Sequence, residues 1–208
     1  KGCSLWHQVD EYHRLADAKA VIDYGFHGVI QHVDDSVLGE MKEIAEKEGI
    51  TSFKVYMTYD FMLKDDQLFQ VLRQAKKDGL VIAVHCENDG VINYLRKQYV
   101  QEGCTQPRYH PLSRPARCEA EAVDRMLHLA AMTDNAPLYI VHLSSKEGLL
   151  EVKKAKAAGQ KNFAVETCPQ YLTLTDSMYQ DDQEGLKAIM SPPLRKKEDQ
   201  EALWQALS

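Results

Sequence analysis

The chain has 208 residues, of which 44% are hydrophobic and 27% are charged, and its formal net charge is −6. That length suits one domain with a sizeable core, and an acidic chain without a basic stripe of interleaved aromatics argues against a nucleic-acid partner. The apolar runs are shorter than the roughly 18 residues that span a bilayer and no charged-then-apolar leader is present, so we expect no membrane partner and a cytoplasmic protein.

The first expected elements are a strand and a helix. Residues 21–30 form an apolar run of strand length, and residues 34–36 (Asp-Asp-Ser) offer helix caps. A helix with an apolar face should follow and end at Gly49, because glycine readily adopts the left-handed conformation of a helix C-terminus. A second strand is expected over residues 52–57, with a helix after it that ends at Gly79.

The middle of the chain continues the alternation. A strand is expected over residues 80–85, and a helix that includes Val91, Ile92, Leu95 and Tyr99 follows it. Residues 103–115 contain three prolines and are expected to be an irregular lid or rim, followed by a long helix.

The last third is expected to contain two more strands, over residues 138–143 and 162–168. The spacing Ser144-x-x-Glu147 between them predicts a capping box at the start of a helix. Residues 188–190 are either a strand end or a loop, because Pro192 and Pro193 stop any strand pairing there.

Repeated strand-helix units with continuously apolar strands favour an α/β fold with a parallel sheet that is buried on both faces. A doubly wound sheet and part of a (β/α)8 barrel both fit this pattern. Polar residues stand at strand ends, where a barrel places its functional groups, and this favours the barrel. Since a closed barrel needs eight strands, we expect residues 1–208 to be one domain that forms the central part of a TIM-like barrel.

Three of these strand-end residues predict a metal site, namely Lys54, His85 and His142. Neutral imidazoles are common ligands of zinc-like ions, but a catalytic site needs about three or four protein ligands. A neutral lysine amine can react with carbon dioxide to give a carbamate, whose two anionic oxygens would bridge two metals. Each residue alone also has an ordinary explanation: a lysine paired at the surface or a hydrogen-bonded core histidine.

The five cysteines add no further metal ligand set. They are Cys3, Cys86, Cys104, Cys118 and Cys168. Their number is odd and they form no C-x-x-C pair, so we expect reduced and mostly buried thiols. Cys86 directly follows His85, and neighbouring strand side chains point to opposite faces, so the two are not expected to share a metal.

Six segments together resemble the cyclic amidohydrolases of the hydantoinase and dihydropyrimidinase family, and particularly their bacterial D-phenylhydantoinase type. They are SFKVYMTY, VHCEN, YHPLSRPARCEAEAV, YIVHLSS, ETCPQYL and MSPPLR. The resemblance covers essentially the whole chain, and the motifs occur in the family's order. It implies a barrel enzyme that uses two divalent metal ions, expected to be Zn²⁺, and opens the ring amide of a small cyclic substrate.

The resemblance also implies roles for individual residues. Lys54 matches the carboxylated lysine that bridges the metals, and His85 and His142 match metal-ligating histidines. Tyr59 matches the tyrosine that stabilises the oxyanion and helps select the ring. Ser191 matches a position whose backbone contacts the substrate imide, and a homotetramer is implied as well.

Several features of the family have no counterpart in these 208 residues. They are the H-x-H pair of the first strand, a late metal-ligating aspartate, a substrate-binding asparagine and a small terminal β-sandwich. We therefore expect this chain to be the central piece of a larger enzyme and to be inactive alone. In the complete enzyme, a hydroxide between the metals would attack the amide carbon, and the product would be an N-carbamoyl amino acid.

Two other interpretations remain open. Allantoinases and dihydroorotases share the metal chemistry, although Tyr59 and the segment Ser113-Arg114-Pro115 favour hydantoins and dihydropyrimidines. A non-enzymatic scaffold relative would have the same fold but would have lost its metal ligands, and here all three candidate ligands are present.

Overall fold

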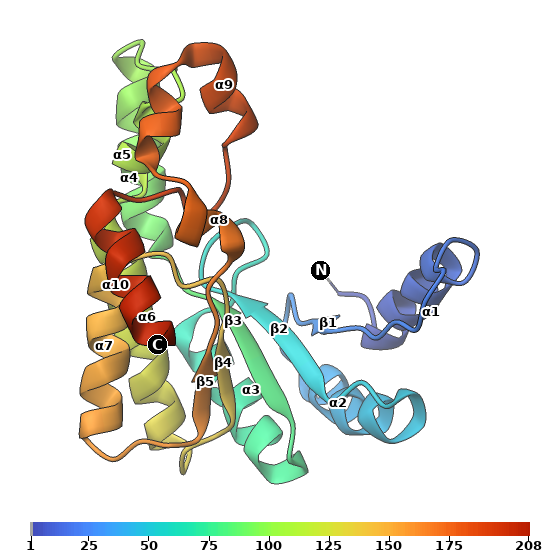
Figure 1. Cartoon of the computed structure of the whole chain (residues 1–208). Helices are drawn as coiled ribbons and strands as arrows, with labels where there is room; N and C mark the ends of the chain where they lie inside the picture. Colours follow the sequence, from blue (N-terminus) through green and yellow to red (C-terminus); the bar gives the residue numbers. More distant parts are fainter. Residues whose placement is uncertain (1) are drawn as a thin grey trace. The chain divides into compact units, whose positions relative to one another are not determined.

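The computed structural model of the chain describes residues 2–208, which form two compact units (Figure 1). Of the described residues, unit 1 comprises 2–85 and His128–Tyr139, and unit 2 comprises Cys86–Leu127 and Ile140–Ser208. Helix α6 (Ala116–Met132) and strand β4 (Leu138–Ile140) each contain residues of both units.

Unit 1 is built on a parallel sheet with helices beside it. Its elements are α1 (Leu5–Ala16), β1 (Gly28–Val29), α2 (Asp35–Glu48), β2 (Ser52–Tyr56), α3 (Asp65–Asp78) and β3 (Val81–His85). Strand β2 pairs in parallel with β1 on one side and with β3 on the other. The start of β4 follows next to β3, where the amide of Ile82 donates to the carbonyl of Pro137 at 3.1 Å.

The expected helix ends in unit 1 are confirmed. Asp34 caps α2, because its side chain accepts a hydrogen bond from the amide of Val37 at 2.9 Å. Gly49 and Gly79 end α2 and α3 with φ angles of 71° and 70°, a left-handed conformation that glycine adopts without a steric penalty.

The two faces of β2 differ in their surroundings. Phe53 and Val55 are completely buried, whereas Lys54 and Tyr56 on the opposite face are half-buried. This alternation follows from the two-residue period of a strand. The half-buried face is therefore the one from which polar side chains can act.

The prediction of a strand over residues 21–30 is wrong for most of its length. Only Gly28–Val29 pairs with β2, and Val21 is 94% exposed. Gly25 interrupts the apolar run, and Phe26 packs its ring against those of Tyr12 and Tyr24 instead of entering the sheet. The helix α1 that precedes this segment was not expected; the side chain of Ser4 caps it.

Unit 2 consists mostly of helices. Its elements are α4 (Asp89–Gln101), α5 (Tyr109–Ser113), most of α6, α7 (Lys146–Ala157), β5 (Phe163–Val165), α8 (Pro169–Thr173), the 3₁₀ helix Asp176–Gln180, α9 (Asp182–Lys187) and α10 (Lys197–Leu207). Figure 1 shows α7 and α10 side by side, in orange and red. The end of β4 lies next to β5, where the amide of Glu166 donates to the carbonyl of Ile140 at 3.0 Å.

Several expectations for unit 2 need correction. The segment expected to be irregular contains the short helix α5, and both expected strands are shorter than predicted. Helix α7 is capped by Ser145, which accepts from the amide of Gly148 at 3.0 Å, so the predicted capping box at Ser144 is wrong by one residue. The hydroxyl of Ser144 donates instead to the buried carboxylate of Glu119. Residues 188–190 form a loop.

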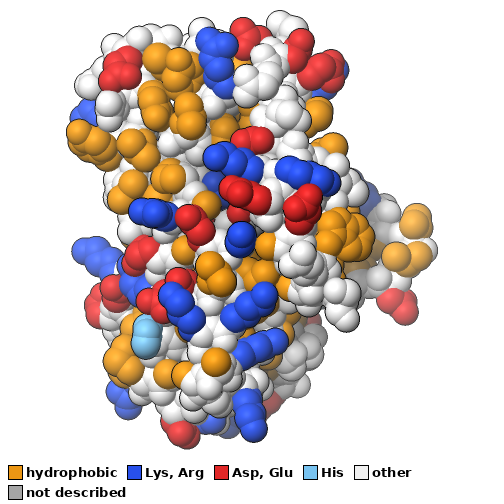
Figure 2. All heavy atoms as spheres, turned by 60° about the vertical axis from the view of Figure 1, so that its left-hand side comes forward, with side chains coloured by type: hydrophobic (Ala, Val, Ile, Leu, Met, Phe, Trp, Pro, Cys, Tyr) orange, Lys and Arg blue, Asp and Glu red, His pale blue; other side chains and the backbone are white. Residues whose placement is uncertain are grey.

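Figure 2 shows Lys and Arg side chains interspersed with Asp and Glu side chains on the helices of unit 2 that face the viewer. No helix within residues 2–208 is both long and apolar enough to cross a membrane. All five cysteines are free thiols; Cys86 and Cys118 are buried, whereas Cys3 is exposed.

Candidate functional site

Two of the predicted site residues, Lys54 and His85, lie on one face of the sheet in unit 1. Lys54 pairs with Ala83 and Tyr56 pairs with His85 across β2 and β3. Paired residues of neighbouring strands place their side chains on the same face of a sheet. Lys54, Tyr56 and His85 therefore share the half-buried face of β2, near the C-terminal end of the strands.

The aromatic ring of Tyr56 connects the lysine to the histidine. The Nζ atom of Lys54 lies 5.2 Å from the centroid of the Tyr56 ring. The ring of His85 stacks on the same tyrosine, with centroids 5.8 Å apart and an angle of 25° between the planes. His85 itself is only 2% exposed, so its imidazole is held among aromatic rings away from bulk water.

Tyr59 joins this cluster from the turn that follows β2. Its ring centroid lies 5.3 Å from that of His85, and its ring also stacks on Phe61 with centroids 5.7 Å apart. The backbone of Tyr59 has a φ angle of 78°, which is rare for a residue with a side chain and costs roughly 1–3 kcal/mol. Strained residues of this kind concentrate at functional sites, and here the conformation directs the tyrosine toward His85.

Tyr56 was not identified from the sequence as a site residue. Burial raises the pKa of its hydroxyl, so the group stays a neutral donor at ordinary pH. The two-residue alternation of β2 already placed Tyr56 on the face of Lys54. The signal was therefore present, but a strand tyrosine more often packs in a core.

In unit 2, His142 follows β4 with a φ angle of 46° and is half-buried. Its amide donates to the carboxylate of Glu166 at 3.3 Å, and the amide of Leu143 donates to the carbonyl of the same glutamate at 2.8 Å. The hydroxyl of Thr167 donates to the carbonyl of Leu143 at 2.7 Å. The ends of β4 and β5 are thus connected by several hydrogen bonds around His142.

Ser191 lies in a loop whose neighbouring residues are held by side chains from other segments of unit 2. His110 donates through Nε2 to the carbonyl of Met190 at 2.6 Å and so supports this loop directly. Tyr171 donates to the carbonyl of Pro192 at 2.7 Å, and burial raises the pKa of its hydroxyl. The hydroxyl of Tyr179 accepts from the amide of Leu194 at 3.0 Å.

Over 207 aligned residues, which cover 100% of the chain, the sequence is 50% identical to that of a D-phenylhydantoinase from Escherichia coli O9:H4 (strain HS). A solved dihydropyrimidinase from Brevibacillus agri NCHU1002 superimposes on the whole chain with a TM-score of 0.96 and 44% identity. A D-hydantoinase from a Bacillus sp. AR9 gives the same two values. The resemblance to the hydantoinase and dihydropyrimidinase family is confirmed.

The chain is shorter than the proteins that it matches. The chain spans 44% of the D-phenylhydantoinase and 45% of the dihydropyrimidinase. No family model matches the chain. A dihydroorotase from Campylobacter jejuni shares the fold with a TM-score of 0.69 at 15% identity. With a parallel sheet flanked by helices and these structural neighbours, the predicted fold class, part of a (β/α)8 barrel, is confirmed.

The metal assignment that the hydantoinase resemblance implies stays a prediction. Within residues 2–208, no group of three or more His, Cys, Asp or Glu side chains is placed to hold a metal ion. The donor chemistry nevertheless fits part of such a site, because His85 offers a buried imidazole and Lys54 lies on the same face of the sheet. Lys54 needs conversion to a carbamate before it can supply an anionic oxygen.

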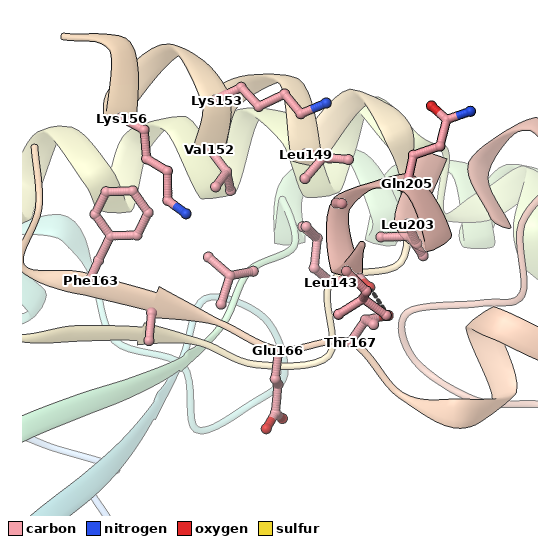
Figure 3. Close-up of a pocket in the computed structure, with 14 residues that line it drawn as sticks. Leu143, Leu149, Val152, Lys153, Lys156, Phe163, Glu166, Thr167, Leu203 and Gln205 are labelled. Carbon is pink, nitrogen blue, oxygen red and sulfur yellow. Dashed lines mark hydrogen bonds between the residues drawn. The ribbon is translucent and has the colours of Figure 1, made fainter. Parts of the chain in front are cut away.

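Unit 2 contains a cavity of about 420 Å³. It is lined by apolar side chains of α7, β5 and α10, including Val152, Phe163 and Leu203 (Figure 3). Lys153 and Lys156 of α7 also line it. Figure 3 shows the carboxylate of Glu166 pointing away from the apolar side chains of this cavity. The cavity contains none of the five predicted site residues.

Proposed function

We propose that the complete protein hydrolyses the ring amide of hydantoins or dihydropyrimidines and releases N-carbamoyl amino acids. The observation that carries this proposal is the cluster of Lys54, Tyr59 and His85 at the C-terminal end of β2 and β3. The 50% identity to a D-phenylhydantoinase along the whole chain supports the choice of substrate class.

The side chains have distinct roles in this proposal. Lys54 as a carbamate, His85 and His142 would help to hold two divalent ions, which lower the pKa of a bound water and so supply a nucleophile. The hydroxyl of Tyr59 donates a hydrogen bond to the carbonyl oxygen as negative charge develops there. The backbone at Ser191 orients the ring imide.

The environment of each group supports its role. The ring of Tyr59 contacts both Phe61 and His85, and these contacts restrict the ring before substrate arrives. Tyr56 contacts both the lysine and the histidine, and His85 is 2% exposed. A preorganised donor in a partly dry site stabilises a developing oxyanion more than one in bulk water does.

The experiment combines metal analysis with ring opening. The product of the complete reading frame is assayed against 5-phenylhydantoin, dihydrouracil, allantoin and dihydroorotate. Turnover of the first two with two metals per chain supports the proposal. Turnover of allantoin or dihydroorotate alone would move the substrate class to those relatives, and a chain without metal or turnover would favour a scaffold. The cytoplasmic location and the homotetramer stay predictions.

A further inference from the structure

Unit 2 contains a buried cluster of charged side chains to which the proposed chemistry assigns no role. Glu87, Arg114, Glu119 and Arg195 are 0%, 4%, 2% and 8% exposed. Two carboxylates and two guanidinium groups balance in charge. Burying ions is expensive and gives little net stability even when they are paired, so such a cluster calls for an explanation other than stability alone.

Glu119, in the first turn of α6, binds the segment that follows His142. Its Oε1 atom accepts from both the amide and the hydroxyl of Ser144, each at 2.9 Å, and its Oε2 atom accepts from the hydroxyl of Ser145. Burial raises the pKa of this carboxyl, while Arg195 and the two serines oppose that rise. Since Ser144 is two residues after His142, the glutamate fixes the backbone just beyond this candidate ligand.

Arg195 reaches the same serine from the segment that follows Ser191. Its Nε atom donates to the hydroxyl of Ser144 at 3.1 Å, and its Nη1 atom donates to the carbonyl of Arg114. Arg114 in turn donates to the carboxylate of Glu87, which follows β3. Ser144 is thus the point at which the two segments meet.

The packing around Glu119 leaves little freedom for another arrangement. A Cβ atom on Gly148 would lie 3.2 Å from the Oε2 atom of Glu119 and 2.8 Å from a methyl carbon of Leu143. Only a glycine at this position lets the start of α7 approach the carboxylate so closely. The contact between Glu119 and the serines therefore depends on the local sequence and not on the two side chains alone.

We propose that Glu119 and Arg195 are positioning residues: through Ser144 they hold the segment after His142 against the segment after Ser191. This inference rests on the proposed function for its effect on turnover, but the contact itself can be tested without turnover. Glu119 and Arg195 are not expected to touch substrate.

The test uses the product of the complete reading frame with Arg195→Lys, Glu119→Gln and Glu119→Ala. Lysine keeps the charge but replaces the planar guanidinium, whose Nε and Nη1 atoms contact Ser144 and the carbonyl of Arg114, with a single nitrogen atom. In Arg195→Lys the Ser144 amide keeps its acceptor Glu119, so faster hydrogen exchange there reports movement of the segment. Gln160→Ala is the matched control, because it removes a hydrogen bond to the carbonyl of Leu127 in unit 2 and touches neither segment.

We expect Arg195→Lys to speed exchange at the Ser144 and Leu194 amides and to lower kcat/KM about 10- to 100-fold, the effect of a small misplacement of binding groups. Glu119→Gln should retain more kcat/KM than Glu119→Ala, because its amide oxygen still accepts from Ser144. Gln160→Ala should leave kcat/KM and these two amides unchanged.

The proposal is overturned if Arg195→Lys leaves exchange at Ser144 and Leu194 at the wild-type rate, or if exchange rises equally throughout unit 2. Wild-type kcat/KM in Arg195→Lys would overturn it as well. If the wild-type protein opens none of the rings, the proposed function fails, and the exchange pattern alone decides whether the two residues hold the segments together.

Discussion

Tyr56 and His85 occupy paired positions on β2 and β3, and their rings stack with centroids 5.8 Å apart. The same register places Lys54 opposite Ala83. The amine of Lys54 then lies 5.2 Å from the Tyr56 ring. Tyr56 therefore contacts Lys54 and His85, two of the residues that the sequence singled out in this unit.

Replacing Tyr56 by alanine should loosen both neighbours. We expect the free energy of unfolding to fall by about 1–3 kcal/mol, because a half-buried ring with aromatic contacts is lost. We also expect the bound metal per chain to fall, since His85 loses the ring that orients it. Urea unfolding and metal analysis measure the two effects. Tyr56→Phe keeps the ring and should retain both properties; a loss of metal in this control would assign the effect to the hydroxyl.

Replacing Tyr59 by phenylalanine tests the oxyanion donor. Turnover should fall about 100- to 1000-fold, the usual effect of removing one such hydrogen bond, while the stacking on Phe61 is kept. Steady-state kinetics on the best ring substrate measure the change. Tyr24→Phe removes an exposed hydroxyl of the same unit, bonded to Asp17, and should leave turnover unchanged. Normal turnover in Tyr59→Phe would remove this residue from the role.

Capping residues in the sequence correctly predicted where helix α2 begins and ends. Asp34 and Gly49 bound α2 as expected, because caps and left-handed glycines act within one turn of the helix. The prediction of a strand over residues 21–30 is wrong for most of its length. The apolar character of this run suggested a strand, but the ring of Phe26 packs against Tyr12 of α1. Strand formation depends on a partner that the local sequence does not reveal.

The site was predictable only in part. Lys54 and His85 carried a signal because polar groups at strand ends are unusual, and the structure places both on one face. His110 and Glu119 carried none, since their partners Met190 and Ser144 are distant in the sequence. Such contacts arise from tertiary packing and leave no periodicity or local motif.

Replacing Lys54 by alanine should remove the bridging ligand. We expect the complete protein to lose both metals or to retain at most one, because alanine cannot form a carbamate. Metal analysis after dialysis measures the change, and Lys42→Ala, an exposed lysine of α2, is the control. Unchanged metal content in Lys54→Ala would refute the assignment of Lys54 as a bridging ligand. The role of Tyr59 would still be tested separately by Tyr59→Phe.

The 208 residues alone should not open hydantoin rings. The described residues contain no complete group of metal ligands, and the chain spans 44% of the D-phenylhydantoinase it matches. The measurement compares the 208-residue chain with the product of the complete reading frame, at equal concentration and with added Zn²⁺. Ring opening by the verified 208-residue chain would contradict this expectation.

His110 should make stability depend on pH. Burial lowers the pKa of its imidazole from the ordinary value of 6.5, against a weaker opposing effect of the hydrogen bond to Met190. The unfolded chain then binds a proton more readily than the folded one, so this contribution to stability is complete above about pH 6.5 and is lost as the pH falls. We expect the free energy of unfolding to decline as the pH falls from about 7 to about 5.5.

The variant His110→Gln isolates this contribution, because glutamine does not titrate and its amide can still donate to the carbonyl of Met190. Urea unfolding at several pH values should give a shallower decline for His110→Gln than for the wild type. His128→Gln, at an exposed histidine of α6, should follow the wild-type curve. If His110→Gln declines as steeply as the wild type, other groups cause the acid sensitivity, and burial of His110 does not contribute to it.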